Sequence, residues 1–331
     1  MNETPRLQWE RIQQAVLDIR RETSRVIVGQ ESVVEQLLTS LLCKGHCLLV
    51  GVPGLAKTLL VSTLGRILGL KFQRIQFTPD LMPTDIVGSE ILQQSGDGAR
   101  RFEYMHGPIF ANLILADEIN RTPPKTQAAL LEAMQEKQVT VNGQTRRLEE
   151  PFIVFATQNP IEHEGTYPLP EAQLDRFFFQ IHIGYPTLED EAEIVRRTTG
   201  HDIPEASTVL TPQGVMELQN ATLDVPLPDN VVQLILRLVH ATRPESPLAA
   251  ADVKNYVAYG AGPRASQTLA RAVRALALLR GQTSASPEEV RAVALPVLRH
   301  RVITNYNATG EGIGADEIIG RVVKEVMGEG K

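Results

Sequence analysis

Cysteine is rare in this sequence, aromatic residues are few, and long apolar runs are missing. Two cysteines among 331 residues exclude a small scaffold held together by disulfides and favour a reducing compartment. The first residues, Met1 to Glu10, do not join a basic segment to an apolar one, and no stretch approaches about 18 apolar residues. These absences predict neither export nor a membrane span, and we expect a cytoplasmic protein.

Positive charge is also in short supply. The chain has 33 Lys and Arg against 39 Asp and Glu, which gives a formal net charge of −6 at pH 7. Such a chain has no general attraction for phosphate backbones or anionic lipid, so we do not expect nucleic acid as a partner. Hydrophobic residues at 43% and charged residues at 22% are ordinary for globular proteins, and the length suffices for one large or two moderate domains.

Short apolar runs alternate with helical patterns in the first half of the chain. Parallel strands that are buried on both faces of a sheet read as continuous apolar runs rather than as an alternation. The pattern therefore predicts an α/β fold with a five-stranded parallel sheet. The expected strands cover residues 46–50, 72–77, 113–116, 152–157 and 178–183.

Two β-hairpins are expected as insertions in this α/β region, near residues 91–104 and 138–148. Their turns fall at Ser95 to Gly98 and at Asn142-Gly143, and the second is a preferred type I′ sequence. After residue 186 the strand signals stop, and the remaining pattern predicts helices near 188–199, 212–222, 230–242, 264–280, 287–299 and 315–327. The predicted organisation is an N-terminal helix (1–25), an α/β domain (26–186) and an all-helical domain (187–331).

Residues 51–58, GVPGLAKT, follow the first expected strand and open a helix, which is the context of a phosphate-binding loop. Lys57 can reach the β- and γ-phosphates, and Thr58 can ligate Mg²⁺. Ala56 stands where a glycine is usual; because a left-handed conformation costs alanine about 1–2 kcal/mol, we expect a negative φ there. The alternative is a plain strand-to-helix turn with an exposed lysine. We assign nucleotide contacts to Gly51, Pro53, Gly54, Leu55, Ala56, Lys57, Thr58 and Leu59.

Polar residues follow two further expected strands. Asp117 and Glu118 come after the third strand, and Asn159 ends the fourth. The carboxyl ends of parallel strands meet at the edge where open α/β folds bind ligands. There Asp117 can hold Mg²⁺ through water, Glu118 can orient and deprotonate an attacking water, and Asn159 can hydrogen-bond that water and the γ-phosphate. Taken singly, the acidic pair is typical of a helix cap or solvated turn, and Asn159 of an Asn-Pro turn.

Together these motifs resemble the MoxR family of AAA+ ATPases. The resemblance rests on GVPGLAKT at 51–58, LADEINR at 115–121, FATQNP at 155–160 and LDRF at 174–177, and it covers about residues 26–300. Even Ala56 looks like the family's own form of the loop. The resemblance implies a nucleotide-binding domain followed by a helical lid, ATP and Mg²⁺ as cofactors, and a homo-oligomeric ring, expected to be a hexamer.

The resemblance also implies roles that spacing does not assign. Gly29 and Gln30 match residues that lie near the adenine in similar proteins. Arg176 resembles the arginine finger that a neighbouring subunit inserts against the γ-phosphate, and Arg264 resembles the second sensor, which reports the nucleotide state to the lid. The plain alternatives are a surface ion pair for Arg176 and an ordinary helix start for Arg264. A guanidinium suits both roles, because its planar fork pairs with phosphate oxygens and stays charged.

The function implied by the resemblance is that of a chaperone-like ATPase that remodels or matures partner proteins, with a von Willebrand factor A (VWA) domain protein as the expected partner. Two alternatives remain open, a magnesium-chelatase-type motor subunit and a nucleotide-gated scaffold with little turnover. The hairpins resemble insertions of the helix-2-insert clade. Their arginines form either a contact surface or a solvated one, and they are Arg100, Arg101, Arg146 and Arg147. Cys43 and Cys47 are expected in the core rather than in a metal site.

Overall fold

A five-stranded parallel sheet forms the centre of the protein, as the sequence predicts. The structure, a computed structural model, describes residues 5–94, 100–162 and 164–328. The strand order is β2-β5-β8-β1-β9. The strands are β1 (Cys47–Val50), β2 (Phe72–Gln76), β5 (Leu113–Asp117), β8 (Ile153–Gln158) and β9 (Phe179–His182). Each expected strand is found, with ends that differ by at most one residue.

Both faces of the sheet are covered, which explains the continuous apolar runs. Successive side chains of a strand point to opposite faces. Leu49 accordingly packs in a core with the helices α1 (Pro5–Val26), α2 (Glu31–Leu42) and α3 (Lys57–Ile67), whereas Leu48 packs in a second core with α4 (Pro83–Val87) and α5 (Pro124–Glu136). Two short helical turns complete this region, η1 (Ile119–Arg121) and α6 (Glu171–Leu174).

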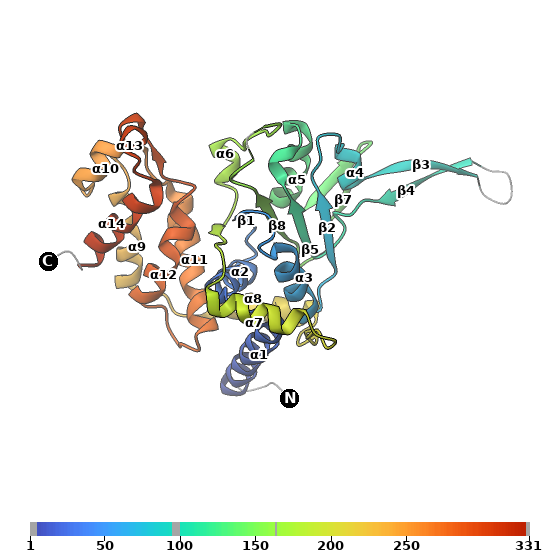
Figure 1. Ribbon diagram of the computed structural model, residues 1–331, viewed down its shortest axis with the longest axis horizontal. Coiled ribbons are helices and arrows are strands. Elements are labelled where there is room, and N and C mark those ends of the chain that lie inside the picture. The colour runs from blue at the N-terminus through green and yellow to red at the C-terminus, as the bar shows by residue number, and fades with distance from the viewer. Residues whose placement is uncertain (1–4, 95–99, 163, 329–331) are drawn as a thin grey trace.

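Both predicted hairpins are present. β3 (Gly88–Gln94) pairs antiparallel with β4 (Arg100–His106) and projects from the body of the molecule (Figure 1). The turn expected at 95–98 lies outside the described residues, as does the side chain of Arg101. β6 (Gln138–Val141) pairs with β7 (Gln144–Arg147), and both residues of their turn have the positive φ of a type I′ turn. The guanidinium of Arg146 lies 3.9 Å from the ring centre of Tyr104, so the two hairpins contact each other.

Helices dominate the chain after residue 186, as the sequence predicts, but a small sheet that the sequence did not predict lies among them. β10 (Val257–Tyr259) and β11 (Ile303–Thr304) form a small antiparallel sheet. Strands of two or three residues are too short to show a period of two, and their pairing joins segments far apart in sequence. The helices are α7 (Leu188–Thr198), α8 (Pro212–Asp224), α9 (Asp229–Ala241), α10 (Ala251–Tyr256), α11 (Pro263–Leu279), α12 (Pro287–Leu298), α13 (Tyr306–Glu311) and α14 (Ala315–Met327).

The helices α9 to α14 gather at one side of the sheet (Figure 1). Their apolar residues belong to the same core as one face of the sheet. The domain boundary near residue 186 stays a prediction. Both cysteines are buried, and burial raises the pKa of each thiol to about 12. Within the described ranges, no helix has the length and apolar character needed to cross a membrane.

His46 precedes β1 and is buried with both ring nitrogens engaged. Nδ1 accepts a hydrogen bond from the backbone N–H of Val154 at 2.9 Å, so Nε2 carries the proton and donates to the carbonyl of Met134 at 3.1 Å. Burial is the main cause that lowers the pKa of His46 to about 4. The folded protein therefore keeps this imidazole neutral at pH values where the unfolded chain would protonate it.

We expect His46 to make folding sensitive to acid. The stability that neutral His46 adds to the folded state is complete above about pH 6.5, the pKa of histidine in the unfolded chain. It is lost as the pH falls toward 4, at up to about 1.4 kcal/mol per pH unit. The free energy of unfolding should fall by about 3 kcal/mol over that range from this residue alone. Denaturant unfolding of the wild type and of His46→Gln, from pH 7 to pH 4, measures the difference in slope; equal slopes would contradict this assignment.

Candidate functional site

The loop between β1 and α3 is built for close approach to a ligand. A Cβ on Gly51 would lie 2.8 Å from the carbonyl oxygen of Ile183, and Gly54 has φ of 85°, so both positions need glycine. Lys57, the first residue of α3, turns its ammonium back to donate to the carbonyls of Gly51 and Val52. Partial burial lowers the pKa of Lys57, while Asp117 and Glu118 act in the opposite direction.

The expectation of a negative φ at Ala56 is wrong. Ala56 has φ of 54° and ψ of 25°, and its carbonyl accepts the helical hydrogen bond of Leu60 N–H at 2.9 Å. The chain must bend sharply between Gly54 and the start of α3, and a left-handed residue beside right-handed ones makes the concave row of N–H groups that binds anions. The strain of about 1–2 kcal/mol is held in place by the strand and helix on either side.

Asp117 and Glu118 lie at the carboxyl end of β5 and share one hydroxyl. Thr157 of β8 donates its hydroxyl to Oδ1 of Asp117 at 2.6 Å and accepts the backbone N–H of Glu118 at 2.8 Å. Glu118 has φ of 58°, another left-handed residue that is not glycine. Its carboxylate lies 3.1 Å from Arg121. Nothing in the local sequence points to Thr157, although its hydroxyl orients both acids.

Asn159 forms the turn that its sequence allowed, and its amide group also keeps a donor without a partner among the described residues. Its side-chain oxygen accepts the backbone N–H of Ile161 at 3.2 Å, which is the turn typical of Asn-Pro. Its Nδ2 is buried and has no hydrogen-bond partner among the described residues. A buried unpaired amide N–H costs roughly 1–3 kcal/mol and thus calls for an acceptor from outside the chain.

These residues surround one hollow of about 390 Å³, which we call the loop hollow. The loop supplies backbone N–H groups and an ammonium, Thr58 and Asp117 supply the oxygen ligands that Mg²⁺ prefers, and Asn159 supplies an unused donor. The donor set therefore fits a nucleotide phosphate with Mg²⁺. The lining residues are Pro53, Gly54, Leu55, Ala56, Lys57, Thr58, Arg74, Asp117, Glu118, Thr157 and Asn159.

Arg74, like Thr157, is a residue of this hollow that the sequence analysis missed. It lies on the edge strand β2, and its Nη2 and Nε donate to Oδ2 of Asp117 at 2.6 and 3.0 Å. Its side chain is 48% exposed. With Thr157 on Oδ1 and Arg74 on Oδ2, both oxygens of Asp117 already accept hydrogen bonds. An arginine in an edge strand provides no signal of its own, because it usually faces solvent.

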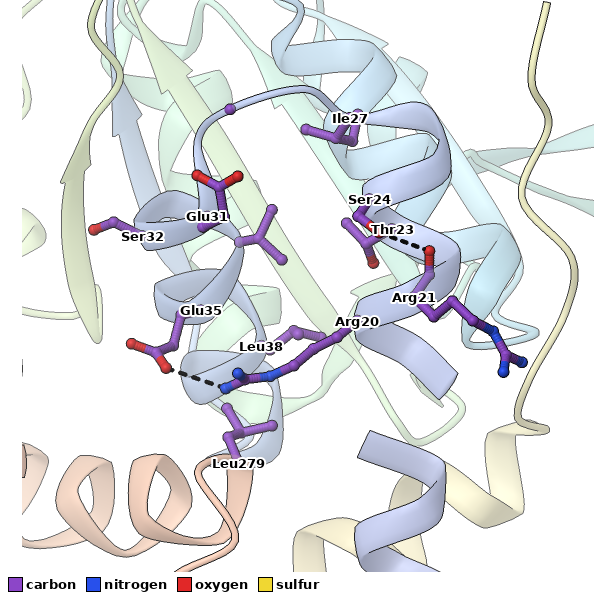
Figure 2. Close-up of a pocket in the computed structure, with 12 residues that line it drawn as sticks. Arg20, Arg21, Thr23, Ser24, Ile27, Glu31, Ser32, Glu35, Leu38 and Leu279 are labelled. Carbon is purple, nitrogen blue, oxygen red and sulfur yellow. Dashed lines mark hydrogen bonds and ion pairs between the residues drawn. The ribbon is translucent and has the colours of Figure 1, made fainter. Parts of the chain in front are cut away.

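Gly29 and Gln30 lie elsewhere than the loop hollow. Gly29 lines the larger hollow between α1 and α2, of about 530 Å³, where Arg20 reaches across to Glu35 (Figure 2). A Cβ on Gly29 would lie 2.8 Å from the carboxylate of Asp190 in α7. The segment from Ile183, just after β9, to Asp190, in the first turn of α7, thus passes both Gly51 and Gly29.

Arg176 and Arg264 meet in another hollow of about 260 Å³, which we call the cationic hollow. Arg176 is exposed, and Nη1 of Arg264 lies 3.0 Å from the carboxylate of Asp175. Asp175 is the single carboxylate among the described residues that line this hollow. Its cationic lining residues are Lys44, Lys137, Arg176, Arg264, Arg271 and Arg301. The structure thus separates both arginines from the loop hollow and places them together.

Comparison with known proteins decides the family. Residues 46–179 match the ATPase family associated with various cellular activities (AAA), and residues 249–322 match the AAA lid domain. The chain is 49% identical over 305 residues to Chaperone MoxR1 of Mycobacterium tuberculosis, which covers 92% of this chain and 80% of that protein. The chain belongs to the MoxR family of AAA+ ATPases.

A solved structure agrees with this fold. A crystal structure of a protein from Cytophaga hutchinsonii has a TM-score of 0.89 and 42% identity, over 96% of both chains. The magnesium-chelatase 38 kDa subunit of Acidiphilium rubrum is a more distant relative, 29% identical over 66% of this chain and 61% of that protein. Membership of an ATPase family agrees with the donor set of the loop hollow, which suits a nucleotide with Mg²⁺.

We expect Arg74 of this MoxR-family protein to compete with Mg²⁺ for Asp117. Arg74→Gln frees one carboxylate oxygen, so the Mg²⁺ concentration that gives half-maximal tightening of ADP binding should fall. A partly exposed ion pair contributes about 1 kcal/mol at most, which corresponds to a fall of at most about fivefold. Titration of a fluorescent ADP analogue with Mg²⁺ measures this midpoint.

A matched control for this titration is Arg66→Gln, which removes an arginine of α3 that pairs with Glu205. Its midpoint should equal that of the wild type. A midpoint for Arg74→Gln that rises, or that does not move, would show that Arg74 is no competitor of Mg²⁺.

Proposed function

We propose that this protein is an ATP-hydrolysing ring ATPase that remodels or matures partner proteins. The observation that carries the proposal is the loop hollow, where the ammonium of Lys57, the acidic pair and the unpaired amide of Asn159 converge. A plain strand-to-helix turn would not need a left-handed Ala56, a left-handed Glu118 and an orphan donor at one edge of the sheet. Their coincidence favours phosphate chemistry over a structural role.

In this proposal each residue of the loop hollow has a separate task. Lys57 leaves the carbonyls of Gly51 and Val52 to neutralise the β- and γ-phosphates, and the N-terminus of α3 adds its partial positive charge. Thr58 and Asp117 hold Mg²⁺, which supplies charge stabilisation for the phosphates when it is bound. Glu118 orients and deprotonates the attacking water, and Asn159 donates its free N–H to the γ-phosphate or to that water.

The adenine has a proposed place between the loop and residues 29–30. Gly29 and Gln30 contribute backbone groups there, and the connection between β9 and α7 borders both segments. Tyr185 of that connection and Leu188 at the start of α7 are among the exposed large apolar side chains, with 79% and 80% of their surface accessible. Exposed apolar side chains beside a phosphate site suit the face of a purine ring.

The cationic hollow supports an assembly in which sites are shared between subunits. Arg176 is exposed and lines this hollow, whereas the phosphate-binding residues line the loop hollow. A neighbouring subunit whose loop hollow faces the cationic hollow would place Arg176 and Arg264 on its nucleotide. Because every subunit carries one hollow of each kind, such contacts are head-to-tail, and we propose that they close into a ring, a hexamer.

Proteins are the proposed clients, with a VWA-domain protein first among them, and a cytoplasmic location stays a prediction. The similar protein of Mycobacterium tuberculosis is named a chaperone, which favours this function over that of the more distant chelatase subunit. A scaffold with little turnover would not need Lys57, Glu118 and Arg176 together. The projecting β3–β4 hairpin and Arg146 offer a surface for contact with such a client.

Two variants of the loop hollow should fail at different steps. Lys57→Ala removes the charge that faces the phosphates and should weaken ATP binding at least about tenfold, whereas Glu118→Gln should bind ATP as the wild type does and lose most turnover. Calorimetric ATP titration and steady-state phosphate release measure the two steps. Equal loss of ATP affinity in both variants would exclude these separate tasks for Lys57 and Glu118.

Arg176→Ala should keep its fold and its ATP affinity and lose turnover by about 10³-fold or more, since it removes charge stabilisation from the transition state. Mixing it with Lys57→Ala should restore part of the activity, because a junction then exists where an intact Arg176 faces an intact loop. The ATPase rate of each parent and of the mixture, measured over a range of protein concentrations, tests this. An Arg176→Ala protein with near-normal ATPase would exclude a shared site.

A further inference from the structure

Arg301 is almost completely buried, and the proposed chemistry does not use it. The residue follows α12, and 3% of its side chain is exposed. Its Nε donates to the carboxylate of Asp175 at 2.8 Å, and its Nη2 donates to the carbonyls of Phe177 at 2.7 Å and of Asp175 at 3.3 Å. Its Nη1 donates to the carbonyl of Val297 in α12 at 2.5 Å. One side chain from the C-terminal region thus binds the backbone on both sides of the proposed arginine finger.

The two residues before Arg301 bind the same stretch of backbone. Nε2 of His300 lies 3.1 Å from the carbonyl of Phe177, and Nη1 of Arg299 donates to the carbonyl of Gln180 at 3.1 Å. Arg299 also forms an ion pair with Asp316 of α14 at 2.8 Å. Residues 299–301, which we call the clamp, therefore join the end of α12 to residues 175–180.

The backbone on both sides of Arg176, the proposed arginine finger, is held in place, while the side chain of Arg176 is exposed. Phe177 and Phe178 are buried, and Phe178 N–H donates to the carbonyl of His46 at 2.7 Å. Asp175 accepts from Arg301 on one oxygen and from Arg264 on the other. Arg176 lies between these anchored residues and is itself exposed. Its backbone position is thus set by contacts with the C-terminal helices.

Burying an arginine side chain is unfavourable in free energy compared with burying an apolar side chain. Removing a guanidinium from water costs several kcal/mol, and a well-packed apolar side chain often gives equal or greater stability. A guanidinium offers five donors in a rigid plane, and here it joins the carboxylate of Asp175 to four backbone carbonyls, those of Asp175, Phe177, Phe178 and Val297. That arrangement fixes geometry, which matters most next to a group whose misplacement by about 1 Å can cost about 100-fold in rate.

We propose that Arg301 is a positioning residue that holds residues 175–180, which carry Arg176, to the helical lid. Arg176 and the lid of one subunit then act as one body on the nucleotide of the next subunit. This inference rests on the proposed shared site. Arg301 has no contact with its own loop hollow, whose lining residues are all from other parts of the chain. Loss of Arg301 should therefore impair the neighbour's hydrolysis and spare binding at the subunit's own loop.

Arg301→Lys tests this inference, because lysine keeps the charge and loses the planar fork. We expect ATP affinity within about twofold of the wild type and turnover lowered about ten- to 100-fold. Asp175→Asn removes the carboxylate shared by Arg301 and Arg264, and it should show the same pattern if Arg301→Lys does not fold. Arg321→Gln is the control, since this lid arginine pairs with Asp252 at an exposed site and should retain wild-type turnover.

Mixed rings separate positioning from a general structural defect. Arg301→Lys should regain activity when it is mixed with Lys57→Ala, because the Lys57→Ala subunit supplies an intact finger to an intact loop. It should gain nothing when mixed with Arg176→Ala, since both variants then lack a working finger. Near-normal turnover of both Arg301→Lys and Asp175→Asn, or recovery with Arg176→Ala, would overturn the inference.

The shared site itself is checked by mixing Arg176→Ala with Lys57→Ala. If this mixture recovers ATPase activity but the Arg301→Lys experiments give one of the contradicting results, only the clamp is excluded from the mechanism. Absence of recovery there removes the shared site and the clamp with it.

Discussion

Parallel pairing of β8 with β1 on one side and with β5 on the other is the interaction on which the site depends. Cys47 pairs with Phe155, and Leu113 pairs with Ile153, so all three strands run out at the same edge. Each strand then delivers one component of the loop hollow, namely the phosphate-binding loop, the acidic pair and Asn159. The hydroxyl of Thr157 bridges β8 to β5 at this edge and aligns both acids.

Several unfavourable features gather around that edge. Ala56 and Glu118 both adopt left-handed conformations without being glycine, and Asn159 leaves a buried N–H unused. Each costs roughly 1–3 kcal/mol and persists only because the surrounding strands and helices over-determine it. A sheet with apolar cores on both faces supplies that excess of stability. The strain is therefore evidence for a ligand rather than a defect of the fold.

The separation of two hollows on one chain explains why a single subunit is an incomplete catalyst in this proposal. The loop hollow has an ammonium, two acids and a cation that already pairs with Asp117. The cationic hollow has a surplus of arginine and lysine with Asp175 as its carboxylate among the described lining residues. One hollow needs additional positive charge at a phosphate, and the other needs an anion. In the proposed head-to-tail assembly, each hollow would face the group that it lacks.

The five strands, the loop, the acidic pair and Asn159 were predictable from the sequence. Their signals are local: an apolar run, a glycine at a turn, or a polar residue directly after a strand. The features that could not be predicted depend on contacts between distant segments. Arg74 meets Asp117 across 43 residues and Arg301 meets Asp175 across 126, and neither arginine has a neighbouring residue that announces its partner.

Ala56 and the small β10–β11 sheet show the same limit in the backbone. Alanine prefers a negative φ in isolation, and only the fixed positions of β1 and α3 force the bend that reverses this preference. Strands of two or three residues are specified by the segment they pair with rather than by their own pattern. The sequence determined which elements form and which chemical groups end them, because those depend on neighbours along the chain. The tertiary structure decided which of these groups contact one another, because such contacts depend on the packing of segments that are distant in the sequence.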